Sequence, residues 1–142
     1  MSPLRSLPPL LREEPALVDV LGRADATLAV SEPAWALTFA GLAELSRRHP
    51  IVVVVPTTTE AERLTRDVAA FLGDDAVDLF PAWETLPFER VSPGVEVMGR
   101  RLRAMWKLSD PDRCPRVLVA PVRALIQRLG PHVEDTEPLV VR

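Results

Sequence analysis

The sequence predicts an α/β domain in which helices flank a mostly parallel sheet. Short apolar runs at residues 27–30, 51–55, 77–80 and 116–120 alternate with segments of helical periodicity, which is typical of β-α-β units. The run at 51–55 is β-branched throughout and apolar on both faces, as expected of a strand inside a parallel sheet. A length of 142 residues, with 47% hydrophobic and 26% charged side chains, suits one compact globular domain.

Composition divides the chain into three parts. Residues 1–14 are rich in proline and then acidic, which predicts an extended amino-terminal segment. Residues 15–130 carry the alternating pattern and form the predicted domain, which begins with a short helix at 15–23. Residues 131–142 are predicted to be a linker and the first strand of a following domain, because their β-branched run has no partner in view.

The first apolar run is predicted to be a strand that leads directly into a helix. Ser31 is placed to cap this helix, and Pro33 suits its first turn. Apolar residues recur at helical spacing and also beside that stripe, so we expect the helix to be buried on more than one side. These residues are Ala34, Trp35, Leu37, Phe39, Ala40, Leu42 and Leu45.

The strand at 51–55 is followed by a second helix with clear end signals. Thr59 and Glu62 have the spacing of a capping box, and Gly73 supplies a terminator. Glu62 and Arg66 are also spaced for an i,i+4 ion pair on the outer face. The predicted buried stripe consists of Ala61, Leu64, Val68 and Phe71.

A long connection follows the third strand, and the next helix opens at Ser92 and Pro93. The predicted apolar stripe of this helix consists of Val95, Met98, Leu102 and Met105. After the strand at 116–120 a short helix is expected at 122–129.

The first predicted strand is not followed by the phosphate-binding loop that nucleotide-binding folds with this alternation of strands and helices contain. That loop reads G-x-x-x-x-G-K-[S/T], and its backbone N–H groups and lysine hold phosphates. Here the corresponding positions are Ser31, Pro33, Trp35 and Thr38, with neither glycine nor lysine among residues 31–38. The strands ending at Phe80 and Ala120 also run into prolines and not into a carboxylate that would hold Mg²⁺. We therefore expect no catalytic residue and no bound cofactor in this chain; a residual nucleotide-binding lobe is the alternative.

The sequence has too few histidines and cysteines, at unsuitable spacings, for a metal site or a nucleophilic active site built on them. His49, His132 and Cys114 are the only histidines and cysteine, and none stands at metal-ligand or nucleophile spacing. We predict no metal site. The sequence has no apolar run long enough to cross a membrane and no signal-peptide pattern, so we expect a soluble cytoplasmic protein.

One basic row is a candidate for phosphate contacts. Arg100, Arg103 and Lys107 recur at i, i+3 and i+7, and Arg101 flanks them. Such a row suits a small DNA-contacting module. Such a row is more often the solvated face of an amphipathic helix, where Glu96 would pair with Arg100.

The least ordinary stretch runs from Phe80 to Phe88, with two prolines, Pro81 and Pro87, and, at Trp83, a third aromatic residue. Prolines fix φ and exclude helix, so this connection is expected to be rigid and partly buried. Its motif resembles the amino-terminal domain of the bacterial transcription-repair coupling factors (Mfd). The motif residues are Trp83, Glu84, Thr85, Leu86 and Pro87, continued by Ser92, Pro93 and Arg101, to which the resemblance assigns structural roles.

The resemblance implies a helicase-lobe fold of the RecA class, similar to the first domain of the excision-repair protein UvrB with its nucleotide loop lost. It implies a parent protein that displaces stalled RNA polymerase on double-stranded DNA, using ATP and Mg²⁺ in a separate translocase module. It also implies recruitment of UvrA, mainly through the domain that follows. The role expected of this chain is then a non-catalytic structural platform.

Overall fold

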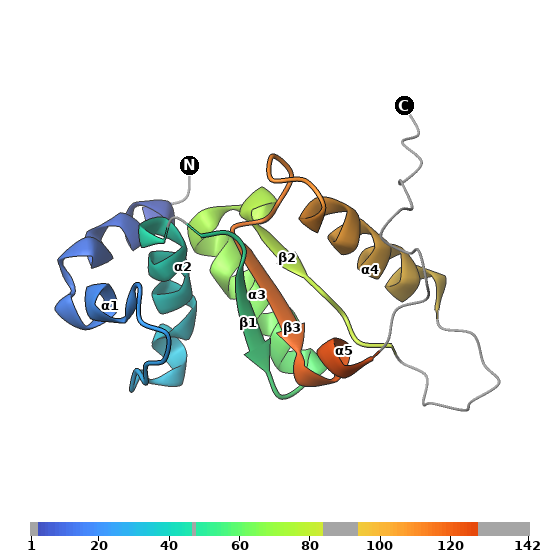
Figure 1. Ribbon diagram of the computed structural model, residues 1–142, viewed down its shortest axis with the longest axis horizontal. Helices are drawn as coiled ribbons and strands as arrows, with labels where there is room; N and C mark the ends of the chain where they lie inside the picture. The colour runs from blue at the N-terminus through green and yellow to red at the C-terminus, as the bar shows by residue number, and fades with distance from the viewer. Residues whose placement is uncertain (1–2, 47, 84–93, 128–142) are drawn as a thin grey trace.

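The computed structural model describes residues 3–46, 48–83 and 94–127. Its centre is a parallel sheet of three strands in the order β1-β3-β2 (Figure 1). The strands are β1 (Ile51–Val55), β2 (Val77–Leu79) and β3 (Val117–Pro121). The predicted α/β class with a parallel sheet is confirmed.

Strand β3 is the central strand, and all five of its residues are buried. Val119 pairs with Val53 of β1 on one side and with Leu79 of β2 on the other. Helix α3 (Thr58–Leu72) connects β1 to β2, which lie at opposite edges of the sheet. Helix α4 (Val95–Leu108) then connects β2 to β3, which lies between the other two strands.

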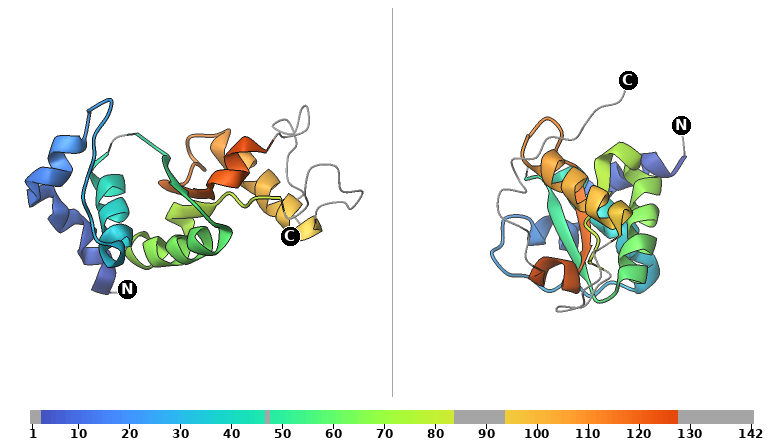
Figure 2. Two further views of the ribbon diagram at one scale, coloured as in Figure 1. Left: turned by 90° about the horizontal axis from the view of Figure 1, so that it is seen from below. Right: turned by 90° about the vertical axis from the view of Figure 1, so that its right-hand side faces the viewer.

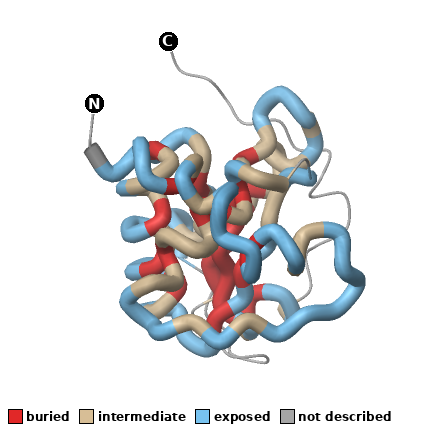
Figure 3. The backbone as a smooth tube through the Cα atoms, turned by 90° about the vertical axis from the view of Figure 1, so that its left-hand side faces the viewer, coloured by how far each residue is buried: buried red, intermediate tan, exposed pale blue. Residues whose placement is uncertain are grey.

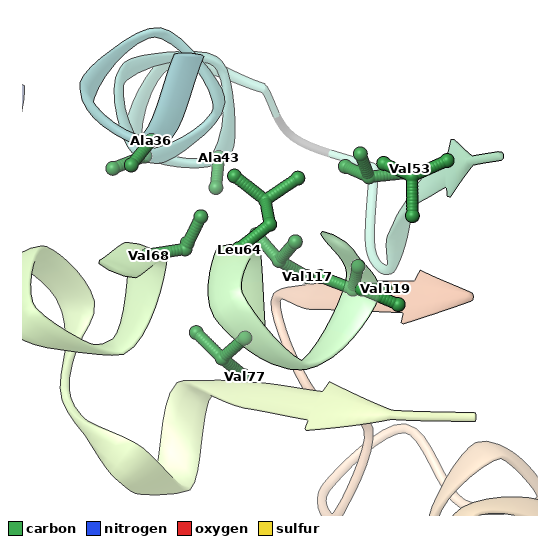
Figure 4. Close-up of a cluster of buried hydrophobic side chains, with 11 residues drawn as sticks. Ala36, Ala43, Val53, Leu64, Val68, Val77, Val117 and Val119 are labelled. Carbon is green, nitrogen blue, oxygen red and sulfur yellow. The ribbon is translucent and has the colours of Figure 1, made fainter. Parts of the chain in front are cut away.

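The helices form a layer on each face of the sheet (Figures 1 and 2). Helix α3 and α2 (Trp35–Leu45) cover one face, where alanines and valines interdigitate (Figure 4). Helix α4 and the short α5 (Val122–Ile126) lie on the other face, around a smaller cluster. That second cluster consists of Phe80, Ala82, Ala104, Leu118, Ala120 and Ala124, with Met105 and Leu108 packed against it.

The amino-terminal segment is helical, so the prediction of an extended segment at 1–14 is wrong where the structure describes it. Two 3₁₀ helices, Pro3–Ser6 and Pro8–Glu13, precede α1 (Pro15–Val20). The fold brings Leu11 and Leu17 against Gly41 of α2, where the missing side chain makes room for them. Composition did not reveal this docking because the contact is tertiary. Figure 3 shows buried positions where these helices meet α2, and exposed turns outside them.

Residues 27–30 are not a strand, which corrects a second prediction. A strand requires a neighbour for its backbone groups, and β1 has no further strand beside it in the described part of the chain. The carbonyl of Val30 instead accepts a hydrogen bond from the indole Nε1 of Trp35, at 3.1 Å.

The capping box of α3 lies two residues earlier than predicted. Thr57 Oγ1 accepts from the N–H of Glu60, at 3.2 Å, and Glu60 Oε2 accepts from the N–H of Thr57, at 3.1 Å. The run of three threonines offers two T-x-x-E registers, and the structure uses the earlier one. The predicted Glu62–Arg66 ion pair is also replaced, because Arg66 Nε donates to the backbone carbonyl of Glu62. The predicted terminator is confirmed: Gly73 follows the helix with φ of 98°.

Candidate functional site: the connection after β2 and its arginine

The segment after β2 is held in place by Arg101 of α4. This side chain is only 1% exposed. Its guanidinium carbon lies 4.2 Å from the ring centroid of Phe80 and 4.6 Å from that of Trp83. Its Nη1 donates to the carbonyl of Pro81 at 2.6 Å. Cation–π contact and a charge-assisted hydrogen bond therefore fasten residues 80–83 to α4.

The charge of Arg101 is only partly compensated. Its Nε and Nη2 atoms are buried and have no hydrogen-bond partner. Burial lowers the pKa of the guanidinium below its usual value, because desolvation penalises the charged form.

The position of Arg101 also explains why the predicted apolar stripe of α4 is wrong in its first half. Val95 is 84% exposed and Met98 is 37% exposed. The buried face of α4 instead presents Arg101 and Ala104 to the sheet. Sequence periodicity excluded an arginine from the core, but two aromatic faces make this one tolerable there.

A second fastening joins Trp83 to the end of α5. The N–H of Trp83 donates to Gln127 Oε1 at 2.6 Å, and Gln127 Nε2 donates to the Trp83 carbonyl at 3.4 Å. Reasoning from the chemistry of the residues did not single out Gln127. The only signal was that the family resemblance also extends over residues 117–128, which include Gln127.

Most of the family motif cannot be placed in this way. Its residues Glu84, Thr85, Leu86, Pro87, Ser92 and Pro93 lie outside the described residues. The helix predicted to open at Ser92 is described from Val95 onward.

The degenerate phosphate loop is occupied by helix. Ser31 precedes a 3₁₀ turn, Glu32–Ala34, without a side-chain capping bond, and α2 follows at once. The hydroxyl of Thr38 donates to the carbonyl of Ala34 at 2.9 Å. An adjacent cavity of about 390 Å³ is lined by Glu32 and Asp67 as well as by Arg63, which pairs with Glu32. Two carboxylates make this a poor environment for a phosphate group.

The predicted basic row does not present three unpaired cations. Arg100 pairs with Glu96 at 2.5 Å, as expected from their spacing. Lys107 pairs with Asp78 of β2 at 2.8 Å, and both of these side chains are mostly buried. Arg103 lines a groove of about 540 Å³ along β2, together with Arg66, Arg100, Glu62 and Asp78.

Within the described ranges, no group of three potential metal ligands is present. In the same residues no helix combines the length and apolar character needed to cross a membrane. Burial raises the pKa of the Cys114 thiol, which disfavours the reactive thiolate.

Comparison with known proteins gives a consistent result. No model of a protein family matches the chain. It is 42% identical over 102 residues to the transcription-repair-coupling factor of Mycobacterium tuberculosis, covering 68% of this chain and 8% of that protein. It is 33% identical over 129 residues to the factor of Escherichia coli, covering 89% of this chain and 10% of that protein. The factor of Haemophilus influenzae is 38% identical over 92 residues, 63% of this chain and 8% of its own length.

The chain thus spans a tenth or less of the length of these curated relatives. The similarity extends over most of this chain, and the three relatives carry the same name. The chain is a homologue of the transcription-repair-coupling factors, consistent with an amino-terminal domain of that family.

Proposed function

We propose that the chain is the first α/β domain of a transcription-repair-coupling factor and acts there as a non-catalytic platform for recruiting UvrA. In the parent protein a separate translocase module would use ATP and Mg²⁺ to displace stalled RNA polymerase from double-stranded DNA. The observation that carries the platform role is the replacement of the phosphate loop by the helical turn at Glu32–Ala34 and by α2. A lobe without that loop has no cradle for a nucleotide.

The fastening around Trp83 supports the same role. Arg101 and Gln127 together tie the end of β2 to α4 and to the end of α5. Residue 127 lies close to the point where the chain would pass into the following domain, so a rigid exit would set the position of that domain.

The test is UvrA binding by this chain beside the parent chain extended through its next domain. We expect binding only by the extended chain. Binding by the 142-residue chain alone would contradict the proposal and would place the docking surface within residues 1–142.

A second measurement separates a platform from a passive tether. Gln127→Ala removes both bonds to Trp83, so in the extended chain we expect it to weaken UvrA binding several-fold. The matched control is Glu13→Gln, a change at an exposed position of the second 3₁₀ helix. Equal affinity of both variants would mean that the exit geometry has no role.

A DNA-contacting module is the competing function, and one observation favours it. Arg103 has no ion pair in the described part of the chain and shares the β2 groove with Arg66 and Arg100. Its signature would be duplex binding whose affinity falls steeply with salt and falls further on Arg103→Ala. The platform role predicts neither effect.

A further inference from the structure

Strand β2 forms the edge of the sheet opposite to β1, and its outer side carries backbone groups. The N–H of Phe80 donates to the carbonyl of Val119 at 2.8 Å, so Phe80 faces β3. Because backbone groups alternate in direction along a strand, those of Val77 and Leu79 point away from β3. No strand among the described residues lies on that outer side.

The outer edge of β2 offers more acceptors than free donors. Asp78 Oδ1 already accepts the N–H of Leu79, at 3.1 Å. The carbonyl oxygens of Val77 and Leu79 face the same side, and no side chain of the described residues donates to either of them. A partner for this edge has to supply hydrogen-bond donors. The N–H groups of a peptide do so, whereas the phosphate oxygens of nucleic acid accept hydrogen bonds.

A groove of about 540 Å³ follows this edge, and we call it the β2 groove. It lies between α3 and α4, which cover opposite faces of the sheet (Figures 1 and 2). Both helices contribute exposed arginines to it, namely Arg66 from α3 and Arg100 and Arg103 from α4. The groove therefore combines a strand edge with cations on both of its sides.

Two of the charged residues that line the β2 groove already have partners. Asp78 pairs with Lys107 at 2.8 Å, and Arg100 pairs with Glu96 at 2.5 Å. The attraction that Arg100 and the repulsion that Asp78 exert on an anion are each reduced by these neighbours.

The remaining charges give the groove a positive excess. Within the described residues Arg66 and Arg103 make no ion pair, and neither does Glu62. Two cations against one carboxylate favour an anionic occupant. All three side chains are exposed to water, so the empty groove is stable, as suits a partner that binds reversibly.

The position of the two arginines specifies the pattern of the occupant. Successive side chains of a strand laid beside β2 would point to opposite faces of the sheet. On one face they would meet Arg66 of α3, and on the other Arg103 of α4. Two adjacent acidic residues are therefore needed to reach both arginines.

We propose that the β2 groove binds an extended acidic segment of a partner protein, which adds a strand to the sheet and places adjacent carboxylates on Arg66 and Arg103. This inference goes beyond the platform role and does not depend on UvrA recruitment. Duplex DNA is the competing occupant of the same arginines, and it is included in the test.

The test is the fluorescence anisotropy of a labelled peptide, VTDEVT, titrated with the whole 142-residue chain. Its β-branched residues favour an extended backbone, and its Asp and Glu are adjacent. The control for charge is VTNQVT, which has the same shape and neutral amides. We expect VTDEVT to bind saturably and VTNQVT to bind about tenfold more weakly.

Strand addition has its own readout on the peptide. The N–H groups of alternate residues of a strand face the same edge, so of two adjacent residues only one can donate to β2. N-methylation at the Asp and at the Glu of VTDEVT should therefore have unequal effects. One methylated peptide should bind about fivefold more weakly, and the other should bind as VTDEVT does.

Charge reversal on the protein locates the site. Arg66→Glu and Arg103→Glu should each weaken VTDEVT binding about threefold, because both positions are exposed to solvent. Glu62→Gln should strengthen it slightly, since it removes a repulsive carboxylate. The matched control is Arg12→Glu, an equal change of charge at an exposed position of the second 3₁₀ helix, which should leave the affinity unchanged.

Several results would overturn the inference. Equal affinity for VTDEVT and VTNQVT would exclude recognition of carboxylates, and equal affinity of both N-methylated peptides would exclude strand addition. Binding that neither groove variant weakens would place the peptide elsewhere, for example at the edge of β1. A labelled DNA duplex that binds more tightly than VTDEVT, and loses affinity in Arg103→Glu, would identify nucleic acid as the occupant. None of these measurements contains UvrA, so a negative UvrA experiment leaves them interpretable.

Discussion

Lys107 Nζ of α4 lies 2.8 Å from Asp78 Oδ2 of β2, which joins the only lysine of the chain to an edge strand of its sheet. The side chains are 17% and 22% exposed. That oxygen accepts no hydrogen bond of good angle, so Coulomb attraction compensates its burial. The other carboxylate oxygen accepts the N–H of Leu79 at 3.1 Å. The pair thus fixes α4 against β2 and also satisfies a backbone group beside it.

Lys107→Met should therefore destabilise the chain by about 1–3 kcal/mol, because it leaves Asp78 charged and without its cation. Arg103→Met on the same helix removes a cation with no ion pair in the described residues, and should change stability by less than about 0.5 kcal/mol. Urea unfolding of both variants measures the difference. Equal losses would show that the ion pair contributes nothing specific.

Alanine substitutions at two helical glycines, Gly41 and Gly99, test how tightly α2 packs against the amino-terminal helices. A Cβ at Gly41 would overlap Leu11 Cδ1 and lie 3.1 Å from Leu17 Cδ2, whereas a Cβ at Gly99 would meet nothing within 4 Å. Gly41→Ala should destabilise by about 1–2 kcal/mol, because the amino-terminal helices must move away from α2. Gly99→Ala, inside α4, should stabilise by about 0.5–1 kcal/mol. Thermal unfolding distinguishes the two signs, and a stabilising Gly41→Ala would contradict the docking of Leu11.

The register of the α3 capping box is open to direct measurement. Thr57→Ala removes the acceptor for the Glu60 N–H and should cost about 1 kcal/mol. Thr59→Ala, which tests the register that the sequence first suggested, should cost less than about 0.5 kcal/mol. Chemical denaturation of both variants decides the register. A larger loss of stability in Thr59→Ala than in Thr57→Ala would show that the capping box is formed by Thr59 and Glu62.

Glu44 makes stability depend on pH on the acid side. Arg116 Nη1 donates to Glu44 Oε1 at 2.7 Å, and this hydrogen bond with the guanidinium charge lowers the pKa of the carboxyl. A lowered folded-state pKa gives stability that is present above the unfolded-state pKa and lost as pH falls through the folded-state pKa. Glu44→Gln should therefore flatten the stability profile below about pH 4.5, around the ordinary glutamate pKa. Glu62→Gln is the control, and an unchanged profile in Glu44→Gln would contradict the assignment.

The uncovered side of β1 predicts self-association of the 142-residue chain. Val52 and Val54 are about half exposed beside an open strand edge. Sedimentation velocity should detect species larger than a monomer as concentration rises, and Val52→Lys should reduce them because charge on an edge strand opposes pairing. A sharp, concentration-independent monomeric unfolding transition would be the opposite result.

Local periodicity predicted much of the fold correctly. Strand β1 matches the predicted 51–55, β2 ends one residue before the end of the predicted 77–80, and β3 lies one residue later than the predicted 116–120. These runs are apolar on both faces or end at proline, signals that a few neighbouring residues carry by themselves. The apolar run at 27–30 carried a similar signal and failed, because a strand also needs a partner that its own residues do not specify.

For the candidate site, the sequence by itself determined that residues 31–38 cannot form a phosphate loop, since glycine and lysine are absent there. It also marked Trp83 and Arg101, through the family motif. Only the tertiary structure placed Arg101 in the core between two aromatic rings, paired Lys107 with Asp78, and tied Trp83 to Gln127. These contacts join residues from different helices and strands, and their energies depend on burial. The order of residues along the chain specifies neither the contact partner of a side chain nor its burial, because the partner and the dielectric surroundings exist only once the chain is folded.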